Sequence, residues 1–394
     1  MNGVPVSDPE RLARLAARSL DVIRGAQDAS GAYLASPAFP TYRYSWLRDG
    51  AFIADAMSRC GDVASAEAFF SWCARVIEDR RPRIESLIAR RHAGEPIGRD
   101  EFLPTRYLPD GTESSEEWTD FQLDGYGAWL WALGEHVRRH GRSISPYLEG
   151  AILSARYVAE FRDHPSYDWW EEHPEHLHTS TLAALYGGLR AMSEVDEVDP
   201  RLRTTFAYVA SRIRELVRSD AASRGHLAKW LGGDAVDSSL AAVATPFRLL
   251  EPDDPLVAPT IRRIEVDLVR DHGVYRYADD TYYGGGQWLL LAAFLGWHYF
   301  EVGRVDDAQA ALAWVVGQST DGDELPEQVP AHLLAPDRRQ EWVDRWGPVA
   351  CPLLWSHAMF LTLVLELGLV ATPLVFGPDV NTALRPAASS APPL

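Results

Sequence analysis

Two tryptophans run directly into two glutamates at residues 169–172, inside the stretch YDWWEEHPEHLHT. A carboxyl group held against an indole ring loses solvation, and this desolvation raises its pKa. A carboxylic acid with a raised pKa stays protonated near neutral pH, as a general acid must. The pattern therefore predicts a proton donor at one of the glutamates. The simpler alternative is an acidic pair that faces solvent, in a chain with 56 acidic residues.

A second stretch, TYRYSWLRDGAF at residues 41–52, places a hydrogen-bond donor beside an acceptor. Arg48 and Asp49 could together bind sugar hydroxyl groups, with Tyr42 and Trp46 as hydrophobic walls. Asp49 could equally cap a helix and pair with its neighbour, since aspartate is common at helix starts.

Two further loops carry polar groups next to an expected helix. The stretch EEWTDFQLDGYG (116–127) alternates polar and aromatic side chains, including Trp118 and Gln122, although a capped helix start would explain it equally well. Glu327 lies in the acidic loop DGDELPEQVPAH (321–332), where it is a weak signal by itself.

The loop VYRYADDTYYGGGQW (274–288) offers Arg276 and Trp288. Its three glycines do not form a phosphate-binding loop, because no strand precedes them and no lysine follows. Asp279 and Asp280 do not indicate a magnesium site, since no second acidic motif supports one.

Composition and charge exclude several classes of protein. A net charge of -18 would repel nucleic acids and anionic membranes, so neither is expected as a partner. The sequence MNGVPVSDPERLARLAARSL has no apolar signal core, and the three cysteines show neither a metal-binding spacing nor a disulfide framework. A cytoplasmic location is expected.

His173, His176 and His178 lie close together but lack the HExxH spacing, so no metal site is predicted.

These loops must be positioned by helices, which are predicted in two alternating kinds. Segments that are apolar or small nearly all round occur at 49–59, 122–133, 179–192, 238–250, 286–300 and 355–370. Segments with one apolar stripe and one charged face occur at 8–27, 62–91, 146–162, 200–218, 257–271 and 304–317. The first kind is buried on most sides and the second on one side.

Alternating inner and outer helices predict an all-α (α/α)6 barrel, with six helices in each ring. A helical solenoid is the structural competitor, but the sequence has no repeat of fixed period. No linker divides the chain, so residues 1–378 are expected to form a single catalytic domain. Residues 379–394 are rich in proline, alanine and serine and are expected to be a disordered tail.

Taken together, the loops resemble glycoside hydrolase family 15, which includes glucoamylase, glucodextranase, some trehalases and isomaltose glucohydrolase. The similar segments, in chain order, are YRYSWLRDGAF, EWTDFQLDGYG, YDWWEE, YRYADDTYYGGGQW and LPEQV. The resemblance implies that Glu171 is the general acid and that Glu172 binds or orients the sugar. It implies that Arg276 binds the terminal glucose and that Glu327 is the catalytic base.

The resemblance further implies inverting hydrolysis of a terminal α-glucoside, with two carboxyl groups about 6.5–9.5 Å apart and a water molecule between base and sugar. Arg48, Asp49 and Arg276 would fix the terminal glucose, between the faces of Tyr42 and Trp170. We expect a raised pKa for Glu171 and an ionised Glu327. No metal or cofactor is required.

Departures from the family concern the leaving group. We expect neither a β-sandwich domain before the barrel nor a starch-binding module. Trp342 and Trp346, in a long segment after the expected base, could wall the leaving-group side or simply pack on the surface.

An imported, neutral oligosaccharide with an α-1,6 linkage, of the isomaltose type, is the favoured substrate. The alternatives are α-1,4 glucoamylase-like or trehalase activity and, from another class, an inactive sugar-binding barrel. The oligomeric state stays open.

Overall fold

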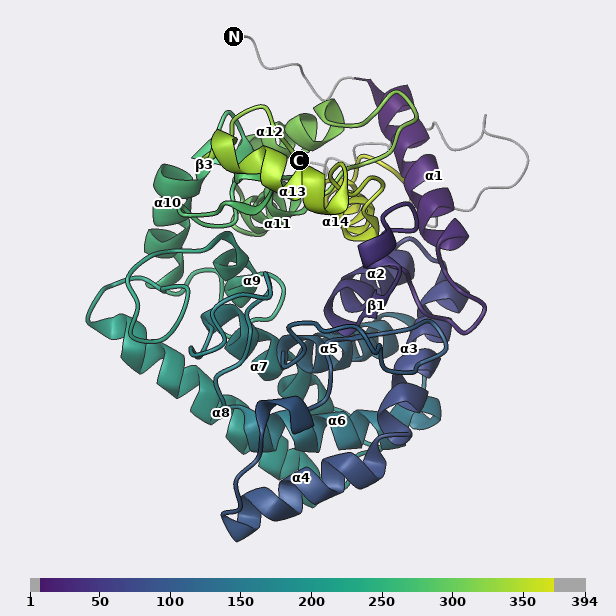
Figure 1. Ribbon diagram of the computed structural model, residues 1–394, viewed down its shortest axis with the longest axis vertical. Coiled ribbons are helices and arrows are strands. Elements are labelled where there is room, and N and C mark those ends of the chain that lie inside the picture. Colours follow the sequence, from purple (N-terminus) through teal and green to yellow (C-terminus); the bar gives the residue numbers. More distant parts are fainter. Residues whose placement is uncertain (1–7, 372–394) are drawn as a thin grey trace, which may run out of the picture.

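The computed structural model describes residues 8–371, so the tail predicted at 379–394 lies outside the described residues. Within residues 8–371, six helices form an inner ring (Figure 1). They are α2 (Leu47–Arg59), α5 (Asp124–His140), α7 (Thr179–Ser193), α9 (Ala241–Ala244), α11 (Leu289–Glu301) and α14 (Leu354–Glu366). Each packs against the next, and α14 packs against α2, so the ring closes. The predicted (α/α)6 barrel is confirmed.

The outer helices pack on the backs of the inner ones. They are α1 (Pro9–Gly25), α3 (Val63–Glu78), α6 (Leu148–Phe161), α8 (Pro200–Ala222), α10 (Val257–Leu268) and α12 (Val305–Gly317). In α8 the buried residues are Phe206, Val209, Ala210, Ile213, Val217 and Ala221, which is a single stripe at helical spacing. Asp199 caps this helix by accepting a hydrogen bond from the backbone N–H of Arg201.

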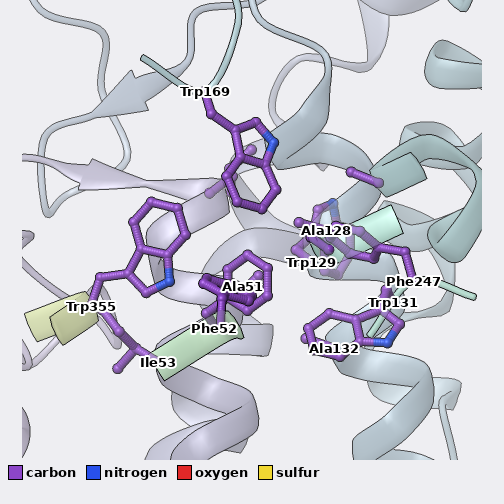
Figure 2. Packing of buried hydrophobic residues seen from close by; sticks show 14 of the residues in the cluster. Ala51, Phe52, Ile53, Ala128, Trp129, Trp131, Ala132, Trp169, Phe247 and Trp355 are labelled. Carbon is purple, nitrogen blue, oxygen red and sulfur yellow. The ribbon is translucent and has the colours of Figure 1, made fainter. Parts of the chain in front are cut away.

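The inner helices are buried all round, as their composition predicts. Every residue of α11 from Leu289 to Tyr299 is buried. On the barrel axis the ring of Phe52 stacks on Trp355 at 5.3 Å, and Trp169 lies 5.6 Å from Trp355 (Figure 2). These aromatic rings fill the barrel interior beneath the loops that carry polar residues.

Two predicted helices are wrong in extent, and both errors are caused by proline. The expected helix 62–91 breaks into α3 and α4 (Arg81–Ala93), because Pro82 has no N–H to donate back into α3. The expected inner helix 238–250 is only a 3₁₀ turn (Ser238–Leu240) followed by α9, since Pro246 cannot continue the ladder.

Short strands tie the loops together at one end of the barrel. The pairs are β1 (Ser45–Trp46) with β2 (Arg106–Tyr107), and a four-stranded ladder of β3 (Val269–Arg270), β4 (Gly273–Val274), β5 (Gln287–Trp288) and β6 (Gln328–Val329). Trp288 pairs with Gln328, so the residue before α11 lies beside the residue after Glu327. An additional helix that the sequence did not predict, α13 (Arg339–Trp346), lies across this end. Over residues 8–371, no helix is both long and apolar enough to cross a membrane.

Candidate active site

The predicted site residues meet in one cavity of about 440 Å³, a size typical of small-molecule sites. The predicted residues that line it are Tyr42, Trp46, Arg48, Asp49, Trp118, Trp170, Glu171, Glu172, Arg276, Trp288 and Glu327. Gln122 is the exception, because it lies behind the wall, where its Oε1 accepts a hydrogen bond from Arg48 Nη1 at 2.8 Å. Segments far apart in sequence therefore converge as predicted.

A tight turn explains why tryptophans and glutamates are adjacent. Glu171 has a φ of 66°, in the left-handed region that non-glycine residues rarely adopt. The turn directs Trp169 and Trp170, 2% and 8% exposed, into the core, while Glu171 and Glu172 face the cavity. Trp46 Nε1 donates a hydrogen bond to Glu171 Oε1 at 2.7 Å, which fixes that oxygen and leaves Oε2 toward the cavity and Thr119.

Glu327 is held on another wall and is only 2% exposed. Its backbone N–H donates to the carbonyl of Ala350 at 2.9 Å, and β6 begins at the next residue. The Tyr42 hydroxyl donates to Glu327 Oε1 at 3.1 Å and lies 2.6 Å from the Tyr282 hydroxyl. Oε2 is buried and has no hydrogen-bond partner among residues 8–371, so it is the oxygen available to accept a proton.

Burial raises the pKa of both carboxyl groups. For Glu171 the charge of Arg48 and the indole N–H of Trp46 act in the opposite direction without cancelling the effect of burial on its pKa. Burial raises the pKa of Glu327 to about 8, against the hydrogen bond from Tyr42. The raised pKa of Glu171 agrees with the expectation, whereas the expectation of an ionised Glu327 is wrong, because the Glu327 carboxyl is buried although most of its acidic loop is not. At a pH between the pKa values of the two groups, the two carboxyls together hold one proton.

Arg48 and Asp49 form part of a buried charge cluster. Arg48 Nη1 lies 3.1 Å from Asp124 Oδ2, and its Nε lies 3.4 Å from Asp49 Oδ1. Burial raises the pKa of Asp49 to about 6, opposed by the charge of Arg48. The expected ion pair is present at the start of α2, but Asp49 does not cap this helix, whose N-cap is Trp46. Arg48 and Asp49 both line the cavity, so their expected role in binding sugar stays a prediction.

Arg276 is locked in place by a carboxylate and by aromatic rings. Its Nε donates to Asp280 Oδ2 at 2.8 Å, and its Nη2 donates to Asp280 Oδ1. Nη2 also reaches Glu172 Oε1 at 3.4 Å, and Tyr277 donates its hydroxyl proton to the other oxygen of Glu172. The guanidinium group is packed among four rings, those of Trp170, Tyr277, Tyr282 and Trp288.

Helix α13 supplies the outer wall. Trp342 and Trp346 both line the cavity, and Trp346 stacks on Trp118 with ring centroids 6.4 Å apart. Trp342 Nε1 donates to the carbonyl of Thr281 at 3.0 Å, which fastens the helix to the Arg276 loop. Arg106, which β2 places beside Trp46, lies 3.7 Å from the ring centroid of Trp118 and supports this wall from behind.

Sequence reasoning missed several residues of the site. Tyr282, Trp355 and Trp169 line the cavity, and Asp280 holds Arg276. Tyr282 and Asp280 lie inside a loop that the sequence had singled out, so loop membership was the available signal. Within residues 8–371 there is no group of three or more His, Cys, Asp or Glu side chains placed to hold a metal ion. His178 Nε2 instead contacts the carbonyl of His173, and His176 stacks on Trp230.

Comparison with known proteins agrees with this geometry. The family described as "Glycosyl hydrolases family 15" matches residues 12–320 of the chain. The chain belongs to glycosyl hydrolase family 15. It is therefore an enzyme that hydrolyses glycosides.

Individual members of family 15 resemble the chain over most of its length. It is 47% identical to an isomaltose glucohydrolase of Kribbella flavida over 371 residues, which cover 93% of this chain and 96% of that one. A glycosidase variant solved in complex with glucose matches with a TM-score of 0.90 and 47% identity, over 93% of this chain and 100% of that chain. A glucoamylase from Saccharomycopsis fibuligera, 15% identical, matches in fold with a TM-score of 0.71, over 92% of this chain and 96% of that one.

Proposed function

We propose that this family 15 enzyme is an inverting exo-α-glucosidase that releases β-glucose from the non-reducing end of short oligosaccharides. The observation that carries the proposal is the pair of buried glutamates in one cavity, each with one oxygen fixed by a neutral donor. Glu171 has Oε1 fixed by Trp46, and Glu327 has Oε1 fixed by Tyr42. The second oxygen of Glu327 has no hydrogen-bond partner among residues 8–371, and that of Glu171 has only a long contact of 3.4 Å from the Thr119 hydroxyl, so each can meet a reacting atom.

Glu171 donates its proton to the glycosidic oxygen, which leaves with the remainder of the sugar. Glu327 accepts a proton from a water molecule that attacks C1 from the opposite face of the ring. Each proton transfer contributes roughly 10²–10⁴ to the rate. Because the acid ends ionised and the base protonated, one proton must return from Glu327 to Glu171 through solvent before the next turnover.

The remaining site residues bind the sugar. Arg48, Asp49 and Arg276 present fixed donors and acceptors to the terminal glucose, whereas Tyr42, Trp170 and Trp288 provide its apolar faces. Trp118 and Trp346 stack at the mouth, where a leaving sugar would lie. No step in this scheme uses a metal or a cofactor.

We propose a preference for α-1,6 linkages of the isomaltose type. The support is 47% identity along nearly the whole chain to a protein named isomaltose glucohydrolase. The flexible 6-linkage also needs a walled site for the leaving sugar, which α13 could provide. Maltose-type and trehalose substrates are the competing possibilities within the family.

Proton NMR during the first minutes of hydrolysis tests the mechanism. Isomaltose, maltose and trehalose are each supplied to the enzyme, and the anomeric signals are recorded before mutarotation. We expect β-glucose to appear first and isomaltose to be cleaved fastest. α-Glucose formed first would refute inversion, while β-glucose with another disaccharide preferred would refute only the linkage assignment.

A further inference from the structure

The chain contains a single lysine, Lys229, and this lysine is buried. Its Nζ lies 3.1 Å from Asp168 Oδ2 and 3.2 Å from Asp237 Oδ2, and 3.5 Å from the ring centroid of Tyr277. The side chains of the two aspartates are 3% and 1% exposed. A buried charge is costly unless it is paired, so removal of the ammonium group would leave two carboxylates together without compensation.

Both aspartates hold the turn that carries Glu171. Asp168 Oδ1 accepts hydrogen bonds from the backbone N–H groups of Trp170 and Glu172, each at 2.9 Å, on either side of Glu171. Asp237 Oδ2 accepts the indole N–H of Trp170 at 2.8 Å. The backbone and the indole next to the proton donor are therefore fixed by carboxylates that meet at one ammonium group.

The turn at Glu171 needs these hydrogen bonds to hold its backbone conformation. A non-glycine residue in the left-handed region carries a conformational cost, and it persists only where its surroundings over-determine it. Burial would raise the pKa of Asp168, but the charge of Lys229, together with the smaller effects of His178 and of the hydrogen bonds to the carboxylate, outweighs burial and holds this pKa below its usual value. Without the charge of Lys229, Asp168 would take up a proton or rotate toward water. Either change would weaken the hydrogen bonds that Asp168 accepts from the backbone N–H groups on either side of Glu171.

We propose that Lys229 is a positioning residue for the proton donor, acting through Asp168 and Asp237. Lys229 lies outside the set of residues that line the cavity, so it acts without touching the sugar. Its compact ammonium group lies at the point where the two carboxylates converge, within 3.1 and 3.2 Å of one oxygen of each. Lys229 is the one lysine among the 38 lysine and arginine residues of the chain. The inference rests on the proposed role of Glu171.

The test compares two substrates for the Lys229→Met variant. The first is the disaccharide that the wild-type enzyme cleaves fastest, whose leaving oxygen needs a proton from Glu171. The second is α-glucosyl fluoride, whose fluoride ion leaves with little help from an acid, while the attacking water still gives its proton to Glu327. A misplaced group can cost about 100-fold in rate, so we expect kcat on the disaccharide to fall by up to about 100-fold and on the fluoride by less than about 10-fold. Equal losses on both substrates, or wild-type rates on both, would overturn the proposal.

Three companion variants make the result specific. Arg59→Met is the matched control, because Arg59 also sits between two carboxylates, Asp55 and Glu366, and over a ring, but outside the cavity lining. Any loss it causes should be equal on the two substrates. If Lys229→Met does not fold, Lys229→Met with Asp237→Asn removes one charge of each sign and keeps an acceptor for the Trp170 indole. We expect the same selective loss from this double variant, and an equal loss would overturn the proposal.

Glu171→Gln separates this inference from the function on which it rests. A selective loss on the disaccharide in Glu171→Gln, without one in the Lys229 variants, would refute only the role of Lys229. The absence of a selective loss in Glu171→Gln would remove Glu171 as the acid, and the proposed function would fail with it.

Discussion

Replacement of Tyr42 by phenylalanine removes one hydrogen bond from the candidate base and keeps the ring. The lost bond runs 3.1 Å from the Tyr42 hydroxyl to Glu327 Oε1. A hydrogen bond to a charged group contributes about 1.5–3 kcal/mol, and this one is longer than the best of its kind, so about 1.5 kcal/mol is expected. Since about 1.4 kcal/mol corresponds to one pKa unit, Tyr42→Phe should raise the pKa of Glu327 by about one unit.

Two consequences follow for the pH profile of kcat/KM. When the two carboxyls together hold one proton, the enzyme is active only if that proton is on Glu171. A higher Glu327 pKa shifts the proton from Glu171 to Glu327. The maximum of kcat/KM should therefore fall about 10-fold. Activity is lost when the last proton leaves the pair, near the Glu327 pKa of about 8 in the wild type. The alkaline limb should therefore move to higher pH in the variant.

Initial rates measured from about pH 4 to about pH 10 would show both effects. Tyr44→Phe is the matched control, because the Tyr44 hydroxyl contacts Ser114 instead of a carboxyl group. A lowered maximum with an unmoved alkaline limb would mean that Tyr42 acts only by contacting sugar. A limb that moves to lower pH would refute the reasoning.

Other predictions concern sugar binding and stability. Arg276→Lys should lower kcat/KM by about 100-fold, because lysine cannot bind Asp280 through two parallel N–H groups, and an unchanged kcat/KM in initial-rate assays would contradict this. Burial lowers the pKa of His357 from 6.5 to about 3, so protons favour the unfolded state: its contribution to stability is complete above pH 6.5 and is lost as pH falls toward 3. Urea unfolding should show a free energy that declines below pH 6.5 and a shallower decline in His357→Gln, and equal slopes would contradict the assignment.

The sequence identified the parts of the site that depend on local pattern. The loops around Arg48, Glu171 and Arg276 combine residue types that are unusual next to one another, and each leads into the site end of the barrel. The inner helices were recognisable because residues such as those of α11 are apolar on every side. Local composition was sufficient to predict a segment where all of its residues share one environment, as the buried residues of an inner helix do.

Long-range pairing was not visible in the sequence. Glu327 was expected to be ionised, yet its carboxyl is buried in the fold next to the β5–β6 pairing, and burial raises its pKa. Helix α13 has no buried residue and a mixed, charged sequence, so nothing local marked it as a helix. Asp280 acquires its role only through the fold of its own loop around Arg276. Each of these features depends on which segments meet in space.

The buried position of Lys229 also concerns the chemistry that a reducing sugar can do to a protein. Glucose in its open-chain form is an aldehyde, and it condenses with exposed primary amines. The ε-amine of Lys229 lies in a side chain that is 6% exposed and is paired with two carboxylates. The other long basic side chains of the chain are all arginines, whose guanidinium groups stay protonated and offer no primary amine. The proposed release of glucose would therefore expose that aldehyde to no freely accessible lysine side chain, and a reagent that couples to lysine amines would find no accessible target among the side chains.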